Sequence, residues 1–277
     1  MNKYLLRSIL LLLVALLLVG CSRHDPLGED PSQAGEPLSS EEQPNDLPPP
    51  DVSDVPDPPE NSEDTPPPPP EHSPLYIPGV SVEDVIRYFN EVCLDAEFVN
   101  SGNASLLQKW AEPIYYTVNG NPTDQDLAVL EDFVAWLNTI EGFPGIYPTQ
   151  DRLAENLQIY FCTGKELLDR MGDQFIGTDG AVTFWYLENK IYDCTICYRT
   201  DILQITRNSV ILEEIYNGLG PVQDTNLRPD SIIYTGYSEP QSLTPVDELL
   251  LKLLYHPQLE CGMDATACEA VIRQLYY

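Results

Sequence analysis

Histidine and basic residues are scarce in this chain. Its 277 residues include three histidines and 14 lysines and arginines against 44 aspartates and glutamates, for a formal net charge of −30. No basic patch is visible, which argues against nucleic acid as a partner. A catalytic zinc site usually takes three protein ligands, often histidines. His24 and His72 lie in a proline-rich stretch and only His256 lies beyond residue 78, so a three-histidine site is excluded there.

Sequence signatures of several enzyme classes are also missing. The chain contains no G-x-S-x-G nucleophile elbow, no glycine-rich phosphate loop and no convincing pair of glycosidase carboxylates. No internal repeat is evident. These absences argue against the hydrolases and nucleotide-binding proteins that a sequence most readily reveals, and we expect no cofactor.

Long apolar runs are confined to the N-terminus. The run Ile9–Val19 is too short to span a bilayer comfortably and has the length of a signal-peptide core. It ends in Leu18-Val19-Gly20-Cys21, which resembles the bacterial lipobox. We expect residues 1–20 to be a lipoprotein signal peptide and Cys21 to be the lipidated mature N-terminus, with an uncleaved anchor or an ordinary signal peptide as alternatives. The lipid would anchor the protein to the bacterial membrane, which predicts an extracytoplasmic position at the cell surface.

Proline and acidic residues dominate residues 21–78. This stretch contains Pro48-Pro49-Pro50 and Pro66–Pro70 and few large apolar side chains. Such a composition cannot bury enough apolar surface to offset the entropy of ordering, and it favours an extended chain of about 3 Å per residue. We expect a disordered linker that holds a domain away from the membrane, with a proline-rich docking site as the alternative.

Residues 79–277 have the length and patterning of one α+β domain. Apolar periodicity and capping residues predict helices that begin near residues 82, 124, 209, 245 and 264. Alternating apolar residues are typical of strands at 112–118 and 156–162, and of a hairpin that turns at 188–190. The expected order is helix, strand, helix, strands, helix and a helical C-terminal part.

The stretch LEEIYNGLGPVQD, residues 212–224, resembles the active-site helix of zincin metallopeptidases, which reads H-E-x-x-H-x-x-G-x-x-H. We align Leu219-Gly220 on the Leu-Gly that often ends that helix. Glu214 then stands at the position of the catalytic glutamate. The three histidine positions hold Glu213, Asn217 and Gln223.

The segment after this helix resembles matrixin-type metzincins, in which a Ser-x-Met-x turn lies under the metal and Leu-Thr-x-x-Asp opens a helix ending in Leu-Tyr. Ser231, Ile233 and Tyr234 match the turn, with Ile233 at the methionine position, and Leu243-Thr244 begins the helix. The chain also resembles a bacterial lipoprotein family of unknown function with W-x-x-P-I, E-E-x-x-x-x-L-G and L-T-x-x-D motifs. These resemblances imply a zincin-like domain: a twisted mixed sheet, a backing helix, a degenerate active-site helix and a helical C-terminal part.

The residues at the former ligand positions suit zinc poorly. Glu213 offers a carboxylate, whereas Asn217 and Gln223 offer neutral amides, which are better suited to hard cations. Without a metal-activated water, Glu214 has no strong nucleophile to generate. We therefore expect no metal and no catalysis. The alternatives are a metallopeptidase-like hydrolase with non-standard ligands and Glu214 as general base, and a hard cation at the acidic loop 223–230.

Six cysteines follow Cys21, and an even number outside the cytoplasm favours disulfides. Cys261 and Cys268 bracket the start of the last expected helix, where a bridge would staple it. The Cys194-Thr-Ile-Cys197 motif is open to interpretation as a redox pair or half of a zinc knuckle. Spacing does not fix the connectivity. The candidates are Cys93, Cys162, Cys194, Cys197, Cys261 and Cys268.

Two functions of different classes fit these features. In the first, a non-catalytic module binds a peptide, glycan or partner protein in the former cleft. That cleft is expected between helix 209–218 and the turn at 231–234, beside an edge strand near 182–187. The zincin edge strand pairs with the substrate backbone, and such pairing needs no metal. In the second, an enzyme with altered chemistry uses Glu214.

Overall fold

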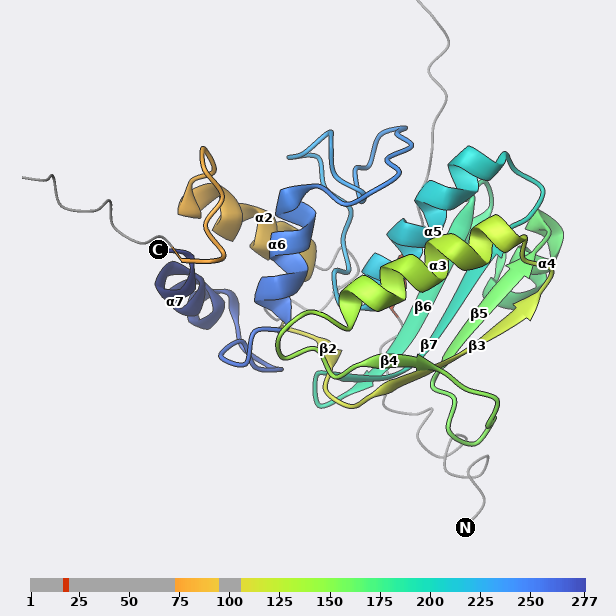
Figure 1. Ribbon diagram of the computed structural model, residues 1–277, viewed down its shortest axis with the longest axis horizontal. Coiled ribbons are helices and arrows are strands. Elements are labelled where there is room, and N and C mark those ends of the chain that lie inside the picture. Colours follow the sequence, from red (N-terminus) through yellow and green to blue (C-terminus); the bar gives the residue numbers. More distant parts are fainter. Residues whose placement is uncertain (1–16, 20–72, 95–105) are drawn as a thin grey trace, which may run out of the picture. The chain divides into compact units, whose positions relative to one another are not determined.

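The computed structural model describes residues 17–19, 73–94 and 106–277 (Figure 1). The predicted linker, the lipidation site and most of the predicted signal peptide lie outside the described residues. The described part is a mixed α+β structure built on a mostly parallel sheet, so the expected fold class is confirmed at that level.

One sheet runs through the described part, and its strand order is β1-β6-β7-β5-β3-β4, with β2 paired to β7. Strands β3, β4, β5 and β7 run parallel, and β6 runs antiparallel to β7. The strands are β1 (Leu17–Val19), β2 (Lys109–Trp110), β3 (Ile114–Gly120), β4 (Ile146–Pro148), β5 (Leu157–Cys162), β6 (Gly180–Leu187) and β7 (Lys190–Arg199).

Helices cover both faces of this sheet. Helices α3 and α5 lie side by side over one face, and α2, α6 and α7 gather at one end of the domain (Figure 1). None of the helices in the described part is both long and apolar enough to cross a bilayer. The helices are α2 (Val82–Leu94), α3 (Asp124–Leu137), α4 (Gly164–Met171), α5 (Gln204–Gly218), α6 (Pro245–Leu254) and α7 (Ala265–Tyr276), with a short 3₁₀ helix, η1 (Asp173–Phe175).

Threonine capping boxes start three of the helices. Thr123 and Thr244 each accept a hydrogen bond from the backbone N–H three residues on, and an aspartate there bonds back to the threonine N–H. Thr163 makes the same box with a glutamate at the start of α4. Each box satisfies two N–H groups that the helix leaves unpaired. The predicted starts at Thr123 and at Thr244-Pro245 are therefore confirmed.

The two faces of the sheet belong to two separate apolar clusters. The larger cluster fills the space between the sheet and helices α3 and α5, and it continues among α2, α6 and α7. A smaller cluster joins Leu167 and Met171 of α4 to Phe175, Ala181 and Cys197. Since successive strand residues point to opposite faces, Ala181 and Cys197 lie on the face of α4.

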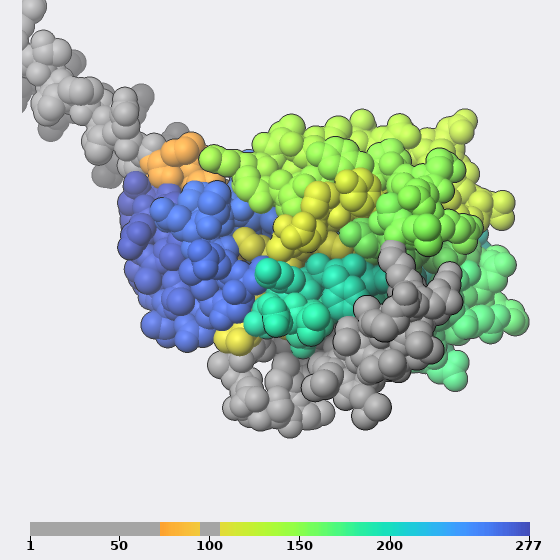
Figure 2. All heavy atoms as spheres, turned by 90° about the horizontal axis from the view of Figure 1, so that it is seen from below, coloured from red at the N-terminus to blue at the C-terminus, as the bar shows by residue number. Residues whose placement is uncertain are grey.

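The hairpin between β6 and β7 turns where the sequence predicted. Glu188 and Asn189 both have positive φ, at 52° and 61°. Two such residues in succession match the twist of a tight hairpin, and asparagine tolerates this conformation well. A Cβ on Gly262 would lie 3.1 Å from Asn189 Nδ2, so the turn packs close to the segment before α7. Figure 2 shows this hairpin beside the C-terminal helices.

The structure differs from the expected elements at α5 and α4. Helix α5 begins at Gln204 rather than near residue 209, because its first turns are polar and hide the apolar period. Helix α4 was not predicted, although Thr163 and Glu166 carry the capping pattern, because eight residues hold too few apolar positions to show a period.

Candidate binding site at the edge strand and its helix

Helix α5 lies against the strands β6 and β7, and one of its faces points at the sheet. A Cβ on Gly180 would lie 2.4 Å from Val210 Cγ1 and 2.7 Å from Glu214 Oε1. A Cβ on Gly218 would lie 3.3 Å from Cys194 Sγ. Residues four apart on a helix share a face. Glu214 therefore lies on the sheet side of α5, at the start of β6, in space that the missing side chain of Gly180 leaves.

The helix residues of the predicted site are buried. Glu213 is 3 % exposed, and Glu214 and Asn217 are 0 % exposed, whereas Gln223 lies beyond the end of α5 and is half-buried. Both side-chain polar atoms of Asn217 lack a hydrogen-bond partner among the described residues. A buried amide in that state costs free energy, about 1–3 kcal/mol for each unmade bond.

The predicted turn after the helix is fixed by one buried carboxylate. Asp247 Oδ1 accepts hydrogen bonds from Ser231 Oγ at 2.7 Å and from Tyr88 Oη at 2.9 Å. Burial raises the pKa of Tyr88, and the nearby Asp247 carboxylate raises it further, so the phenol stays protonated and donates. Tyr216 Oη donates to the Asp247 carbonyl at 2.9 Å. The turn, α2, α5 and α6 thus meet at Asp247.

Ile233 and Tyr234 hold the turn against the acidic loop. Ile233 is fully buried, and its carbonyl accepts a hydrogen bond from the Thr225 N–H at 2.8 Å. Thr225 also forms a parallel bridge with Tyr234 and donates from Oγ1 to Glu91 Oε2 at 2.8 Å. Within the described residues, no group of three or more histidine, cysteine, aspartate or glutamate side chains is placed to hold a metal ion.

The start of α5 is tied to α3 by an ion pair. Arg207 Nε lies 2.7 Å from Asp126 Oδ1, with side chains 6 % and 0 % exposed. Gln204 Nε2 donates to the same oxygen at 2.6 Å. Burial alone would raise the pKa of Asp126, but hydrogen bonds from Arg207, Thr123 and Gln204 lower it below its ordinary value. This pair was not predicted from the sequence, because its members stand 81 positions apart in the chain.

Strand β6 pairs with β7 on one side and with β1 on the other. Leu17, Leu18 and Val19 stand opposite Phe184, Thr183 and Val182 in antiparallel register. These three residues fall within the predicted signal peptide. The outer edge of β6 therefore accepts an extended chain, and it lies beside α5.

Most of the domain matches one known protein family. Residues 82–274, more than half of the chain, match a family described as a protein of unknown function, DUF2927. The chain belongs to the DUF2927 family. The match confirms the expected membership of a family of unknown function, and it covers α5, the turn and β6. A search of curated proteins finds no match.

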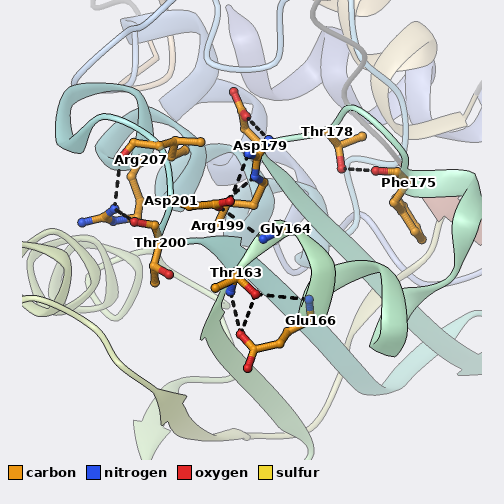
Figure 3. A network of polar contacts seen from close by, with 11 residues as sticks. Thr163, Gly164, Glu166, Phe175, Thr178, Asp179, Arg199, Thr200, Asp201 and Arg207 are labelled. Carbon is orange, nitrogen blue, oxygen red and sulfur yellow. Dashed lines mark hydrogen bonds and ion pairs between the residues drawn. The ribbon is translucent and has the colours of Figure 1, made fainter.

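A cavity of about 300 Å³ lies in the DUF2927 domain beside the start of α4. Arg199 lies 3.0 Å from Asp201 and 3.2 Å from Asp179, and Asp201 Oδ1 accepts a hydrogen bond from the Gly164 N–H at 3.2 Å (Figure 3). Arg199 and Asp201 of the lining are thus paired with each other, whereas Lys165 pairs with Asp169 outside the lining. The lining residues are Gly164, Lys165, Leu167, Leu168, Phe175, Gly177, Thr178, Arg199 and Asp201.

The Cys194-Thr-Ile-Cys197 motif of the DUF2927 domain lies on strand β7. Cys194 belongs to the large cluster on the side of α5, and Cys197 belongs to the small cluster on the side of α4. An odd spacing on a strand places two side chains on opposite faces. The sheet therefore separates the two sulfurs, and the redox-pair and zinc-knuckle interpretations of this motif were wrong.

Proposed function

We propose that this chain is an extracytoplasmic lipoprotein, anchored through lipid on Cys21, whose domain is a non-catalytic, zincin-like module that binds an extended peptide along β6. The observation that carries the proposal is the pairing of Leu17–Val19 with the outer edge of β6. Backbone pairing at a sheet edge provides affinity without any metal.

Three features support the zincin-like part of the proposal. Helix α5 follows β7, the last strand of the sheet, and α3 lies beside it. Strand β6 is antiparallel and stands next to α5. The Ser231 turn is joined to the start of α6 through Asp247, in the segment that resembles matrixins. These are the elements that the resemblance implies.

The residues at the former ligand positions do not fit zinc. A catalytic zinc site needs neutral imidazole, thiolate or carboxylate donors. Asn217 supplies an amide whose two polar atoms bond to none of the described residues, and Gln223 supplies a second amide. We derive no hydrolytic step for Glu214, and the binding module is the better explanation.

A peptide that copies residues 14–20 tests the edge site. We expect it to slow amide hydrogen exchange at Val182–Phe184 in a chain that begins at residue 22. The matched control is the same peptide with alternate backbone nitrogens methylated, which keeps the side chains and removes backbone donors. Equal protection by both peptides, or none by either, would contradict pairing at this edge.

Zinc titration separates the binding module from the hydrolase alternative. With thiols oxidised, calorimetry should show no zinc site of micromolar affinity, because the former ligand positions on α5 offer one carboxylate, Glu213, and one amide, Asn217. A stoichiometric site that disappears in Glu213→Ala would overturn the proposal. Peptide hydrolysis that is abolished by Glu214→Gln would do the same.

A further inference from the structure

Two thiols meet on the α4 face of the sheet. Cys162 is the last residue of β5, and Cys197 lies on the neighbouring parallel strand β7. Cys197 stands opposite Tyr160, two residues before Cys162, so the two cysteines are diagonal neighbours on one face. Both belong to the small apolar cluster, Cys197 buried and Cys162 half-buried. Their side chains are close enough to interact.

The contact between them affects the two thiols differently. Contact with Cys197 lowers the pKa of the Cys162 thiol below its ordinary value, and Arg170 acts in the same direction, whereas burial and the Glu166 and Asp201 carboxylates act against it. Contact with Cys162 and burial raise the pKa of the Cys197 thiol. The thiolate is the nucleophile in disulfide exchange, and it forms more readily where its charge is stabilised. Cys162 is therefore placed to attack first, and Cys197 to attack second.

Three other cysteines of the described part are buried and have thiols with raised pKa values. Burial raises the pKa of Cys93 and of Cys194, and both are fully enclosed. Burial also raises the pKa of Cys268 to about 11. Apolar surroundings make such thiols inert. Cys261 is half-buried and its thiol donates to the Lys109 carbonyl at 3.8 Å, so it serves as a control.

We propose that Cys162 and Cys197 form a reversible disulfide between β5 and β7. The Cys162 thiolate attacks one sulfur of an external disulfide, a new S–S bond forms, and one donor thiolate leaves. Cys197 then loses its proton and attacks the Cys162 sulfur, which releases the second donor thiolate. The two cysteines thus lose two protons and two electrons, and the external disulfide is reduced to two thiols.

Closing this bond moves the start of α4. Diagonal neighbours in a sheet have Cα atoms about 7–8 Å apart, whereas disulfides span about 4.4–6.8 Å, so the end of β5 must approach β7 by about 1–2 Å. Thr163 follows Cys162 directly and caps α4 (Figure 3). Gly164, the next residue, lines the cavity. Oxidation therefore reshapes the cavity beside Arg199.

Peptide mapping of the full chain tests the proposal, with oxidised glutathione as the external disulfide. After alkylation of the remaining thiols, we expect a peptide pair linked through Cys162 and Cys197 and two fewer alkylated cysteines, both restored by dithiothreitol. Amide exchange at Gly164–Leu168 should change on oxidation. The absence of the linked pair would overturn the proposal, and unchanged exchange would overturn its effect on α4.

Single-cysteine variants distinguish the thiol that attacks first, Cys162, from the thiol that attacks second, Cys197. Cys197→Ala should retain glutathione on Cys162, because the second attack is lost. Cys162→Ala should take up no glutathione at Cys197, and the control Cys261→Ala should leave the linked pair intact. Glutathione that persists on Cys162 in the unaltered chain would show that Cys197 does not resolve it. Mapping in the unaltered chain does not depend on the folding of any variant.

Discussion

Asp126 and Arg207 form the most buried of the ion pairs between described residues. Removing one partner of such a pair leaves an uncompensated charge, which costs about 3–5 kcal/mol. Asp126→Ala should therefore lower the free energy of unfolding by that amount in urea titrations at pH 7. Asp124→Ala, an exposed change on the same helical turn, should cost about 0.5 kcal/mol or less. Similar costs for both variants would show that the pair contributes little.

The same carboxylate predicts a pH dependence. The pKa of Asp126 is lower in the folded chain than its ordinary value, despite burial, because Arg207 and other donors bond to it. A carboxylate whose pKa is lowered by folding stabilises the fold at pH values above its pKa in the unfolded chain, which is about 4 for aspartate. That stability is lost as the pH falls through the lower pKa of the folded chain. The gap between the urea midpoints of the unaltered chain and Asp126→Asn should be wide at pH 6 and narrow as pH falls below 4. A gap independent of pH would contradict this assignment.

At the scale of an element, α6 combines a capped start with a buried face. Thr244 Oγ1 accepts from the Asp247 N–H at 3.2 Å, and Leu254 at the other end is 0 % exposed. Thr244→Ala should cost about 1 kcal/mol of unfolding free energy, the usual value for an N-cap. Thr235→Ala, in the loop before α6, is the matched change outside a cap. A cost for Thr244→Ala no larger than that of the loop variant would contradict the capping role.

Leu254 tests how α6 packs. Leu254→Ala should cost about 2–5 kcal/mol, because it removes buried methyl groups and leaves a cavity. Leu187→Ala, at a position 53 % exposed, should stay within about 0.5 kcal/mol of the unaltered chain. Urea midpoints measure both. An unchanged midpoint for Leu254→Ala would mean that this face of α6 does not support the core.

For the whole molecule, the main prediction concerns attachment to the membrane. The lipobox-like Leu18-Val19-Gly20-Cys21 predicts cleavage before Cys21 and lipid on its thiol. Cys21→Ser should release the protein from the membrane fraction or leave its precursor uncleaved. Fractionation and intact mass measure both outcomes. Cys261→Ser should leave attachment unchanged. Membrane retention together with cleavage at another position would contradict lipidation at Cys21.

Local features of the chain were predictable from residue order alone. Thr123 and Thr244 predicted two helix starts, because a cap needs only a side chain and the backbone three residues on. The residues around Glu188 and Asn189 predicted the hairpin turn, since tight turns are set by a few backbone angles. Apolar alternation predicted β5 within one residue of its observed bounds.

Contacts between distant residues were decided only by the tertiary structure. Residue order placed Cys194 and Cys197 together, whereas the pleat of β7 separates them and the pairing of β5 with β7 brings Cys162 to Cys197. The motif around Glu214 gave no sign that the space left by Gly180 would receive its side chain. The physical reason is that caps and turns depend on neighbours in the chain, whereas burial and strand register depend on which segments pack together.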